Sequence, residues 1–264
     1  MTTLATPSPA SGSPLRPTDA AKSTFEKQAQ VLARLTGLLF LVTYATSIPP
    51  VVSFYVPALS DPAYALGGGF DTGLSWGALL EMLLIVANVG TAVALFPVVR
   101  RLNEGLALGY VAARLVESFF IAVGIVSLLA LGTLRFEAGG ADEAALLVAG
   151  RSLVAIHDWT FLLGPGFVVG IGNGLILGYM MFRLRLVPRA MAVLGLVGGP
   201  ALLAFAVAVL FGITEVGTAW QVVATVPEFF WELSFGLWLL VKGFNPSALA
   251  ALSREGSGRV DQAA

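Results

Sequence analysis

Long apolar stretches alternate with short polar connections along most of this chain of 264 residues. An apolar helix of about 20 residues is long enough to cross the hydrocarbon layer of a bilayer. The pattern therefore predicts an all-α fold, a polytopic membrane helix bundle with six transmembrane helices. The predicted spans cover roughly residues 35–59, 74–99, 105–131, 157–183, 190–211 and 220–241.

Prolines and glycines interrupt two of these stretches. Pro49-Pro50 in the first span removes two backbone donors, so the helix is expected to kink or stop there. Gly164-Pro165-Gly166 predicts a kink in the fourth span. The second half of residues 133–151 mixes polar and apolar residues and predicts a short amphipathic surface helix before the fourth span.

The two ends of the chain differ from its middle in composition. Residues 1–30 are rich in Ser, Thr, Pro and Ala and contain no apolar run, so they predict a disordered cytoplasmic tail without a signal-peptide core. Residues 245–264 are short and polar and predict a second disordered cytoplasmic tail. The six-helix transmembrane domain is thereby expected to cover residues 31–244.

Basic residues predict the orientation of the bundle. With six spans both termini lie on one side, and twelve of the fifteen Lys and Arg residues fall in the tails and loops of that side. Arg135 and Arg151 are the two in the opposite loops, and Arg114 lies within a span. Because cytoplasmic loops are enriched in Lys and Arg, the count predicts a multi-pass protein of the cell membrane with both termini cytoplasmic.

Composition agrees with a membrane protein and excludes several functions. The chain is 57% hydrophobic and 12% charged, which a soluble domain of this length would not be. Fifteen basic and sixteen acidic residues leave a net charge of −1, without the positive field that a nucleic-acid partner requires. Zero cysteines and one histidine exclude disulfides and thiolate sites and leave little for haem or copper. No cofactor is expected.

Arg114 and Glu117 stand near the middle of the third span, where ionisable groups are costly. Their spacing of three residues places them on one helix face, where they can pair. One interpretation is that each only neutralises the other. Because a charge pair at that depth costs more than a pair of leucines, we favour a function beyond this pairing.

Glu228 and Glu232 are four residues apart and stack on one face of the sixth span. Both cannot be ionised cheaply, so either one of them carries a proton or Arg114 reaches across to one of them. Such a pair suits acid–base or proton-relay chemistry, and it equally suits a structural knot of hydrogen bonds. Glu81 in the second span is expected at a depth similar to that of Glu228.

His157 and Asp158 begin the fourth span at its predicted outer mouth. One hypothesis makes them the outermost members of a ladder of polar groups that descends to Arg114 and Glu117, which would form a pocket open to the outside. The other makes them an interfacial cap, with Trp159 anchored among the lipid headgroups. No HExxH or HxxxH spacing accompanies His157, so we predict no metal site.

Glycines recur every four residues in the fourth span at Gly166, Gly170, Gly174 and Gly178. Such a ridge favours close helix packing, with Gly195 and Gly199 of the fifth span as possible partners or with a second copy in a homo-oligomer. The segment GIGNG within it lies in an apolar helix and not after a strand, so it is not a phosphate loop. Asn173 on this helix is expected near the bundle interior.

Several segments in this order resemble one membrane family. They are TSIP, the Glu of the second span before LFPVVRR, ALGYVAARLVE, HDWTFLLGPG, RLVPR and FFWELSFGLWLLVKGF. Over roughly residues 30–245 the chain resembles the actinobacterial integral-membrane family catalogued as domain of unknown function 4386. The resemblance implies the six-helix architecture and a recurrent pattern at Glu81, Arg114, Glu117, His157, Asp158 and Glu232. It implies no activity.

Three functions fit these residues. The first is binding or transport of a small solute, a proton or a lipid, with Arg114, Glu117, Glu228, His157 and Asn173 as ligand-binding residues. The second is an intramembrane enzyme on a lipid or isoprenoid, with Glu81, Glu232 and Asp158 as catalytic acids and bases, an analogy of site type with membrane terpene cyclases. The third is a membrane interaction or assembly partner in which the polar groups only fix helix register.

Overall fold

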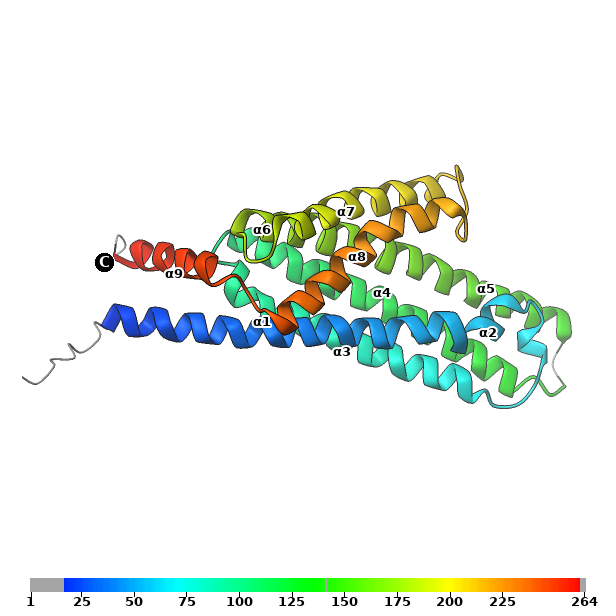
Figure 1. Ribbon diagram of the computed structural model, residues 1–264. Coiled ribbons are helices and arrows are strands. Elements are labelled where there is room, and N and C mark those ends of the chain that lie inside the picture. The colour runs from blue at the N-terminus through cyan, green and yellow to red at the C-terminus, as the bar shows by residue number, and fades with distance from the viewer. Residues whose placement is uncertain (1–16, 141, 262–264) are drawn as a thin grey trace, which may run out of the picture.

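The protein is built from long helices that lie side by side along one axis (Figure 1), and its computed structural model describes residues 17–140 and 142–261. These residues form helices and no strand, which confirms the all-α prediction. In chain order the elements are α1 (Pro17–Pro49), the π-helix η1 (Pro50–Phe54), α2 (Val56–Ser60), the 3-10 helix η2 (Tyr64–Leu66), α3 (Thr72–Val99), α4 (Glu104–Phe136), α5 (Glu143–Phe161), the π-helices η3 (Leu162–Val168) and η4 (Gly170–Leu177), α6 (Gly178–Leu184), α7 (Arg189–Leu210), α8 (Ala219–Val241) and α9 (Pro246–Asp261).

Among the described residues, six helical segments are long and apolar enough to cross a membrane, as predicted. Their ends fall close to the predicted ones in the second, third, fifth and sixth spans, at 72–99, 104–136, 189–210 and 219–241. The protein is therefore a multi-pass membrane protein. α1 begins and α9 lies at one end of the bundle (Figure 1), which we call the terminal end, and we call the opposite end the distal end.

Short polar side chains start three of the spanning helices. Asp71 caps α3 by accepting hydrogen bonds from the backbone N–H groups of Gly73 and Leu74. Asn103 caps α4 and Asp142 caps α5 in the same manner. Each cap satisfies backbone donors that have no partner within the helix, and so sets the point at which the helix begins.

Both predicted tails contain helix. α1 begins at Pro17 and α9 runs from Pro246 to Asp261, where the sequence predicts disorder up to residue 30 and from residue 245; residues 1–16 lie outside the described part. The two helices pack against each other. The Ser253 hydroxyl of α9 donates to Glu26 Oε1 of α1 at 3.0 Å. Just before α9, the Phe244 carbonyl accepts from the Gln30 side chain at 2.7 Å and the Phe244 N–H donates to it at 3.0 Å. These contacts join segments more than two hundred residues apart, so local composition does not reveal them.

The predicted amphipathic surface helix is not a separate element. Residues 143–161 form one helix, α5, and the fourth span continues without a break from Glu143 to Leu184. Its 42 residues are about twice the number that a span needs, so the first turns of α5 extend beyond the hydrocarbon layer at the distal end. The amphipathic pattern belongs to this extension.

Two of the three described π-helices, η1 and η3, contain a proline. α1 ends at Pro49, as expected, and its path continues through the π-helix η1 that starts at Pro50. Pro165 lies within the π-helix η3, where the sequence predicts a kink. Proline lacks the N–H that an α-helix requires, and the wider π turns keep the remaining backbone groups paired inside the membrane.

Helices α1 and α8 pack closely in the terminal half and separate toward the distal end (Figure 1). At their crossing, a Cβ added to Gly37 would lie 2.4 Å from the Leu240 N atom, so the two backbones nearly touch. A large apolar cluster that includes Phe40, Trp231 and Phe235 fills the terminal half of the bundle. The distal half is left with a cavity between the diverging helices.

The glycine ridge packs within the chain. A Cβ on Gly170 would lie 2.8 Å from the Gly199 carbonyl oxygen, and one on Gly174 would lie 2.4 Å from the Gly199 Cα. Gly178 packs against α7 as well, whereas Gly195 faces Trp231 of α8. Gly170, Gly174 and Gly178 are buried by α7, so these three are not available for the homo-oligomer contact considered from the sequence.

Candidate functional site

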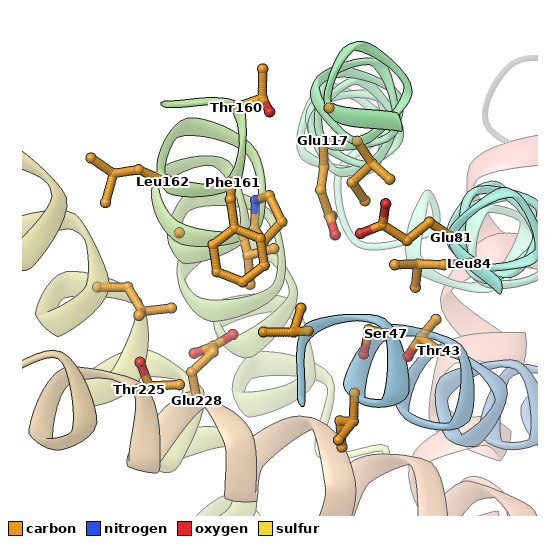
Figure 2. Close-up of a pocket in the computed structure, with 18 of the residues that line it drawn as sticks. Thr43, Ser47, Glu81, Leu84, Glu117, Thr160, Phe161, Leu162, Thr225 and Glu228 are labelled. Carbon is orange, nitrogen blue, oxygen red and sulfur yellow. The ribbon is translucent and has the colours of Figure 1, made fainter. Parts of the chain in front are cut away.

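A cavity of about 560 Å³ occupies the distal half of the bundle. Its walls come from α1, η1, α3, α4, α5, η3, α7 and α8, so every predicted span contributes to it. Figure 2 shows Glu81, Glu117 and Glu228 reaching toward this space from three different helices, with the Phe161 ring between them. Residues of α2 and of the connection between α7 and α8 form its distal rim, including the exposed Val216.

Arg114, Glu117 and Asn88 form a closed hydrogen-bonded network on one wall of the cavity. Arg114 Nη1 donates to Glu117 Oε2 at 2.7 Å, and Asn88 Nδ2 donates to Glu117 Oε1 at 2.9 Å. Arg114 Nη2 donates to Asn88 Oδ1, which closes the triangle. All three side chains are buried. Both oxygens of the Glu117 carboxylate are therefore engaged, and the positive charge of Arg114 is balanced within the network.

A second polar group lies nearer the distal end. The Tyr55 hydroxyl donates to Glu81 Oε2 at 2.9 Å, and both residues are buried. The His157 ring meets the Tyr55 ring edge to face at 5.9 Å between centroids and stacks on Phe161. His157 Nδ1 lies 3.5 Å from Asp158 Oδ1, and the Asp158 side chain is 60% exposed at the rim. Titratable groups thus extend from the rim into the cavity.

Glu228 and Glu232 stand on the wall formed by α8, as their spacing predicts, and they differ in their partners. Asn173 Nδ2 donates to Glu232 Oε1, and Trp231 Nε1 donates to the Asn173 carbonyl at 3.0 Å. Glu228 is 3% exposed, and neither of its carboxylate oxygens has a hydrogen-bond partner among the described residues. The Glu232 carboxylate therefore accepts a hydrogen bond, and the Glu228 carboxylate accepts none from the described residues.

The structure brings seven of the eight predicted site residues to this one cavity: Glu81, Arg114, Glu117, His157, Asp158, Glu228 and Glu232. The eighth, Asn173, is buried behind Glu232 and reaches the cavity through it. The sequence interpretation did not include Asn88 and Tyr55 in the site. The sequence could have assigned Asn88 to the site, because an amide in the middle of an apolar span needs a hydrogen-bond partner. Nothing in the sequence around Tyr55, which lies between two prolines, indicates a site residue.

At the distal end, a small polar cluster ties the connection between α2 and α3 to the last turn of α4. The Tyr64 hydroxyl donates to Asp71 Oδ2 at 2.6 Å, and Arg135 Nη1 donates to the Tyr64 carbonyl at 2.7 Å. Burial of the phenol and its bond to Asp71 raise the pKa of Tyr64. Burial alone would raise the pKa of Asp71, but hydrogen bonds from Tyr64 and from two backbone N–H groups outweigh it and hold that pKa below its usual value.

In the described residues no group of three or more His, Asp or Glu side chains has the arrangement of a metal site. The polar atoms around the cavity are instead spread over several walls that are otherwise apolar. Carboxylates outnumber arginines and lysines on these walls: in the described chain the lining contains Arg114 and five carboxylates, Glu81, Glu117, Asp158, Glu228 and Glu232. The arrangement can hold the polar part of a small molecule while its remainder contacts apolar side chains.

The fold and the cavity together define a class of protein, a polytopic helical membrane protein with ionisable side chains gathered at a buried cavity. Within this class the chain belongs to the family described as a domain of unknown function (DUF4386), which matches residues 35–243 and confirms the resemblance stated above. That range contains all eight predicted site residues. No curated protein and no solved structure matches the chain.

Proposed function

We propose that the protein binds a small amphipathic solute or lipid in the distal cavity. The observation that carries this proposal is the convergence of ionisable side chains from α3, α4, α5 and α8 on one cavity. Ionisable groups within a membrane are costly, and they are generally found where a protein handles a ligand, an ion or a proton. The site residues predicted from the sequence act as its ligand-binding residues in this proposal.

The size and chemistry of the cavity support a small molecule. Its volume of about 560 Å³ lies within the range of about 300–1,000 Å³ that is usual for small-molecule sites. Apolar side chains such as Leu84, Ile121 and Phe205 form much of the wall, and a few polar groups interrupt them. An amphipathic ligand matches this division. Its apolar part gains free energy by leaving water for the apolar wall, and its polar part contacts the carboxylates.

Access to the cavity supports a ligand that arrives from the distal end or from the bilayer. The rim carries the exposed residues Val52 and Asp158, and Ile48 of α1 and Phe229 of α8 are partly exposed where these two helices diverge. Toward the terminal end, the cluster around Trp231 and Phe40 closes the path. Transport would need a second conformation in which that cluster opens, so binding is the part of this function that the geometry supports best.

An intramembrane enzyme acting on a lipid or isoprenoid is the second candidate. It is favoured by the Glu81–Tyr55 hydrogen bond beside the His157 ring, which places acid–base groups next to an apolar space. Glu81, Glu232 and Asp158 are the acids and bases in this version. It differs from the first in requiring that the bound molecule be converted.

Native mass spectrometry and lipid analysis of the protein purified in lipid nanodiscs test the proposal. Thr225 lines the cavity on α8, so Thr225→Trp is expected to fill part of it and to abolish retention of the bound molecule. Val223 is 62% exposed on the same helix outside the cavity lining, and Val223→Trp is the matched control that is expected to retain it.

Loss of the molecule in both variants, or its retention in both, would contradict binding in this cavity. The enzyme version is tested by incubating the recovered molecule with fresh protein and analysing the products. Conversion that stops in Glu81→Gln while retention persists would favour the enzyme. Retention without conversion favours the binding protein.

A further inference from the structure

The Glu228 carboxylate is the least satisfied polar group of the cavity. It is 3% exposed, it borders the cavity, and both of its oxygens lack a hydrogen-bond partner among the described residues. By contrast, Glu117 is held by Arg114 and Asn88, Glu81 by Tyr55, and Glu232 by Asn173. A buried carboxylate without partners is expensive, so this one is expected to have a use.

Close helix packing fixes Glu228 in place. A Cβ on Gly198 of α7 would lie 2.7 Å from Glu228 Oε2, and one on Gly174 of η4 would lie 3.0 Å from the same atom. Because these two glycines have no side chain, the Glu228 carboxylate fits closely against α7 and η4. The same close packing restricts the rotamers that the Glu228 side chain can adopt. Figure 2 shows Glu228 directed from α8 toward the interior of the cavity.

Among the described residues, the basic side chains that line the cavity have other acidic neighbours than Glu228: His157 Nδ1 lies 3.5 Å from Asp158 Oδ1. Arg114 is the arginine that lines the cavity in the described chain, and its guanidinium is engaged by Glu117 and Asn88. The neighbour one turn along α8, Glu232, is another carboxylate. The missing counter-charge must therefore be a proton or a positively charged group of the ligand.

Aromatic rings on the walls of the cavity that Glu228 borders favour a ligand cation with an organic body. Phe161, Phe229 and Tyr44 line the same cavity, and the Tyr44 and Phe229 rings contact each other at 5.1 Å between centroids. Ring faces attract organic ammonium groups, which are weakly hydrated and enter an apolar site more readily than a metal ion does. The pairing of one free carboxylate with several rings is the arrangement expected for such a group.

We propose that the ligand is an organic cation, an ammonium group on an apolar body, and that Glu228 is its counter-ion. This inference rests on the proposed binding function and adds the chemical class of the ligand. The ammonium group sits between the Glu228 carboxylate and the aromatic rings, and the apolar body extends toward the opening between α1 and α8. The Arg114 network and Glu232 shape the acidic side of the site.

Three probes with the same hexyl tail test the charge preference: hexyltrimethylammonium, hexanol and hexanesulfonate. Their binding to the full protein in nanodiscs of neutral lipid is measured by isothermal titration calorimetry, with empty nanodiscs subtracted. The wild type is expected to bind the ammonium probe most tightly and the sulfonate least. Glu228→Gln keeps the shape of the side chain and is expected to weaken the ammonium probe by about 30-fold or more while leaving hexanol unchanged.

Two further variants keep the test specific. Glu228→Asp retains the charge and is expected to retain the preference for the ammonium probe. Glu104→Gln makes the same chemical change on an exposed residue of α4 outside the cavity and is expected to behave as the wild type. Thermal unfolding of each variant shows whether it is folded, and the order in which the wild type binds the three probes carries the test if Glu228→Gln is not.

The outcomes separate this inference from the function on which it rests. Equal binding of the ammonium probe and hexanol, unchanged in Glu228→Gln, would overturn the inference and leave cavity binding intact. Absence of saturable binding for all three probes would overturn both. Tighter binding of the sulfonate would assign the polar site to Arg114 and overturn the inference alone.

Discussion

Replacing Glu117 by glutamine is the sharpest test of the polar network. The Arg114–Glu117 contact of 2.7 Å lies in a region where the two side chains are only 3% and 7% exposed. At an effective dielectric constant of about 20, two unit charges at that distance attract by roughly 6 kcal/mol before desolvation is subtracted. Glu117→Gln leaves the Arg114 charge buried with Asn88 as its direct partner, so we expect a loss of about 3–5 kcal/mol in the free energy of unfolding.

The same reasoning predicts that removing the whole network is far less harmful than removing one member. Asn88→Leu, Arg114→Met and Glu117→Leu together eliminate the charges and the amide, so no buried polar group is left without its partner. We expect the triple variant to lie within about 1 kcal/mol of the wild type in unfolding free energy, because apolar replacements of a buried ion pair are often neutral or stabilising.

Equilibrium unfolding in mixed detergent micelles, followed by circular dichroism, measures all variants against the wild type under one set of conditions. A loss below about 1 kcal/mol for Glu117→Gln, with the triple variant as the least stable protein, would refute the reasoning. Such a result would mean that water in the cavity solvates Arg114 and Glu117, so that the network contributes binding chemistry and little desolvation cost.

Two other predictions concern the helix crossing and the distal connections. Gly37→Ala should cost about 1–3 kcal/mol of unfolding free energy, because its Cβ would lie 2.4 Å from the Leu240 N atom. Gly139→Ala is the control and should cost little, because nothing lies within 4 Å of its Cβ. Equal losses in the two variants would contradict the close crossing of α1 and α8. Asp71→Ala should cost about 1 kcal/mol at neutral pH through loss of the α3 cap. Hydrogen bonds hold the pKa of Asp71 in the folded protein below its value in the unfolded chain. The stability that the Asp71 carboxylate contributes is therefore fully present above the unfolded pKa and is lost as the pH falls through the folded pKa. The unfolding free energies of the wild type and Asp71→Ala should become equal in acid.

The sequence by itself determined the membrane architecture. Six apolar stretches specify six spans, since each must satisfy its backbone within one helix in lipid. The spacing of Arg114 and Glu117 specifies that they share a face, and the structure pairs them. Local rules of this kind need no knowledge of the neighbouring helices. The orientation given by the basic residues stays a prediction.

Only the tertiary structure decided which polar groups meet. Glu228 and Glu232 look equivalent in the sequence, yet η4 supplies Asn173 to Glu232, whereas Gly174 and Gly198 leave Glu228 without a partner. The hydrogen bond of Ser253 in α9 to Glu26 in α1 and the hydrogen bond of Tyr55 to Glu81 likewise join distant or irregular segments. The physical reason is that periodicity fixes the face on which a residue lies, while the partner across that face depends on how the helices cross.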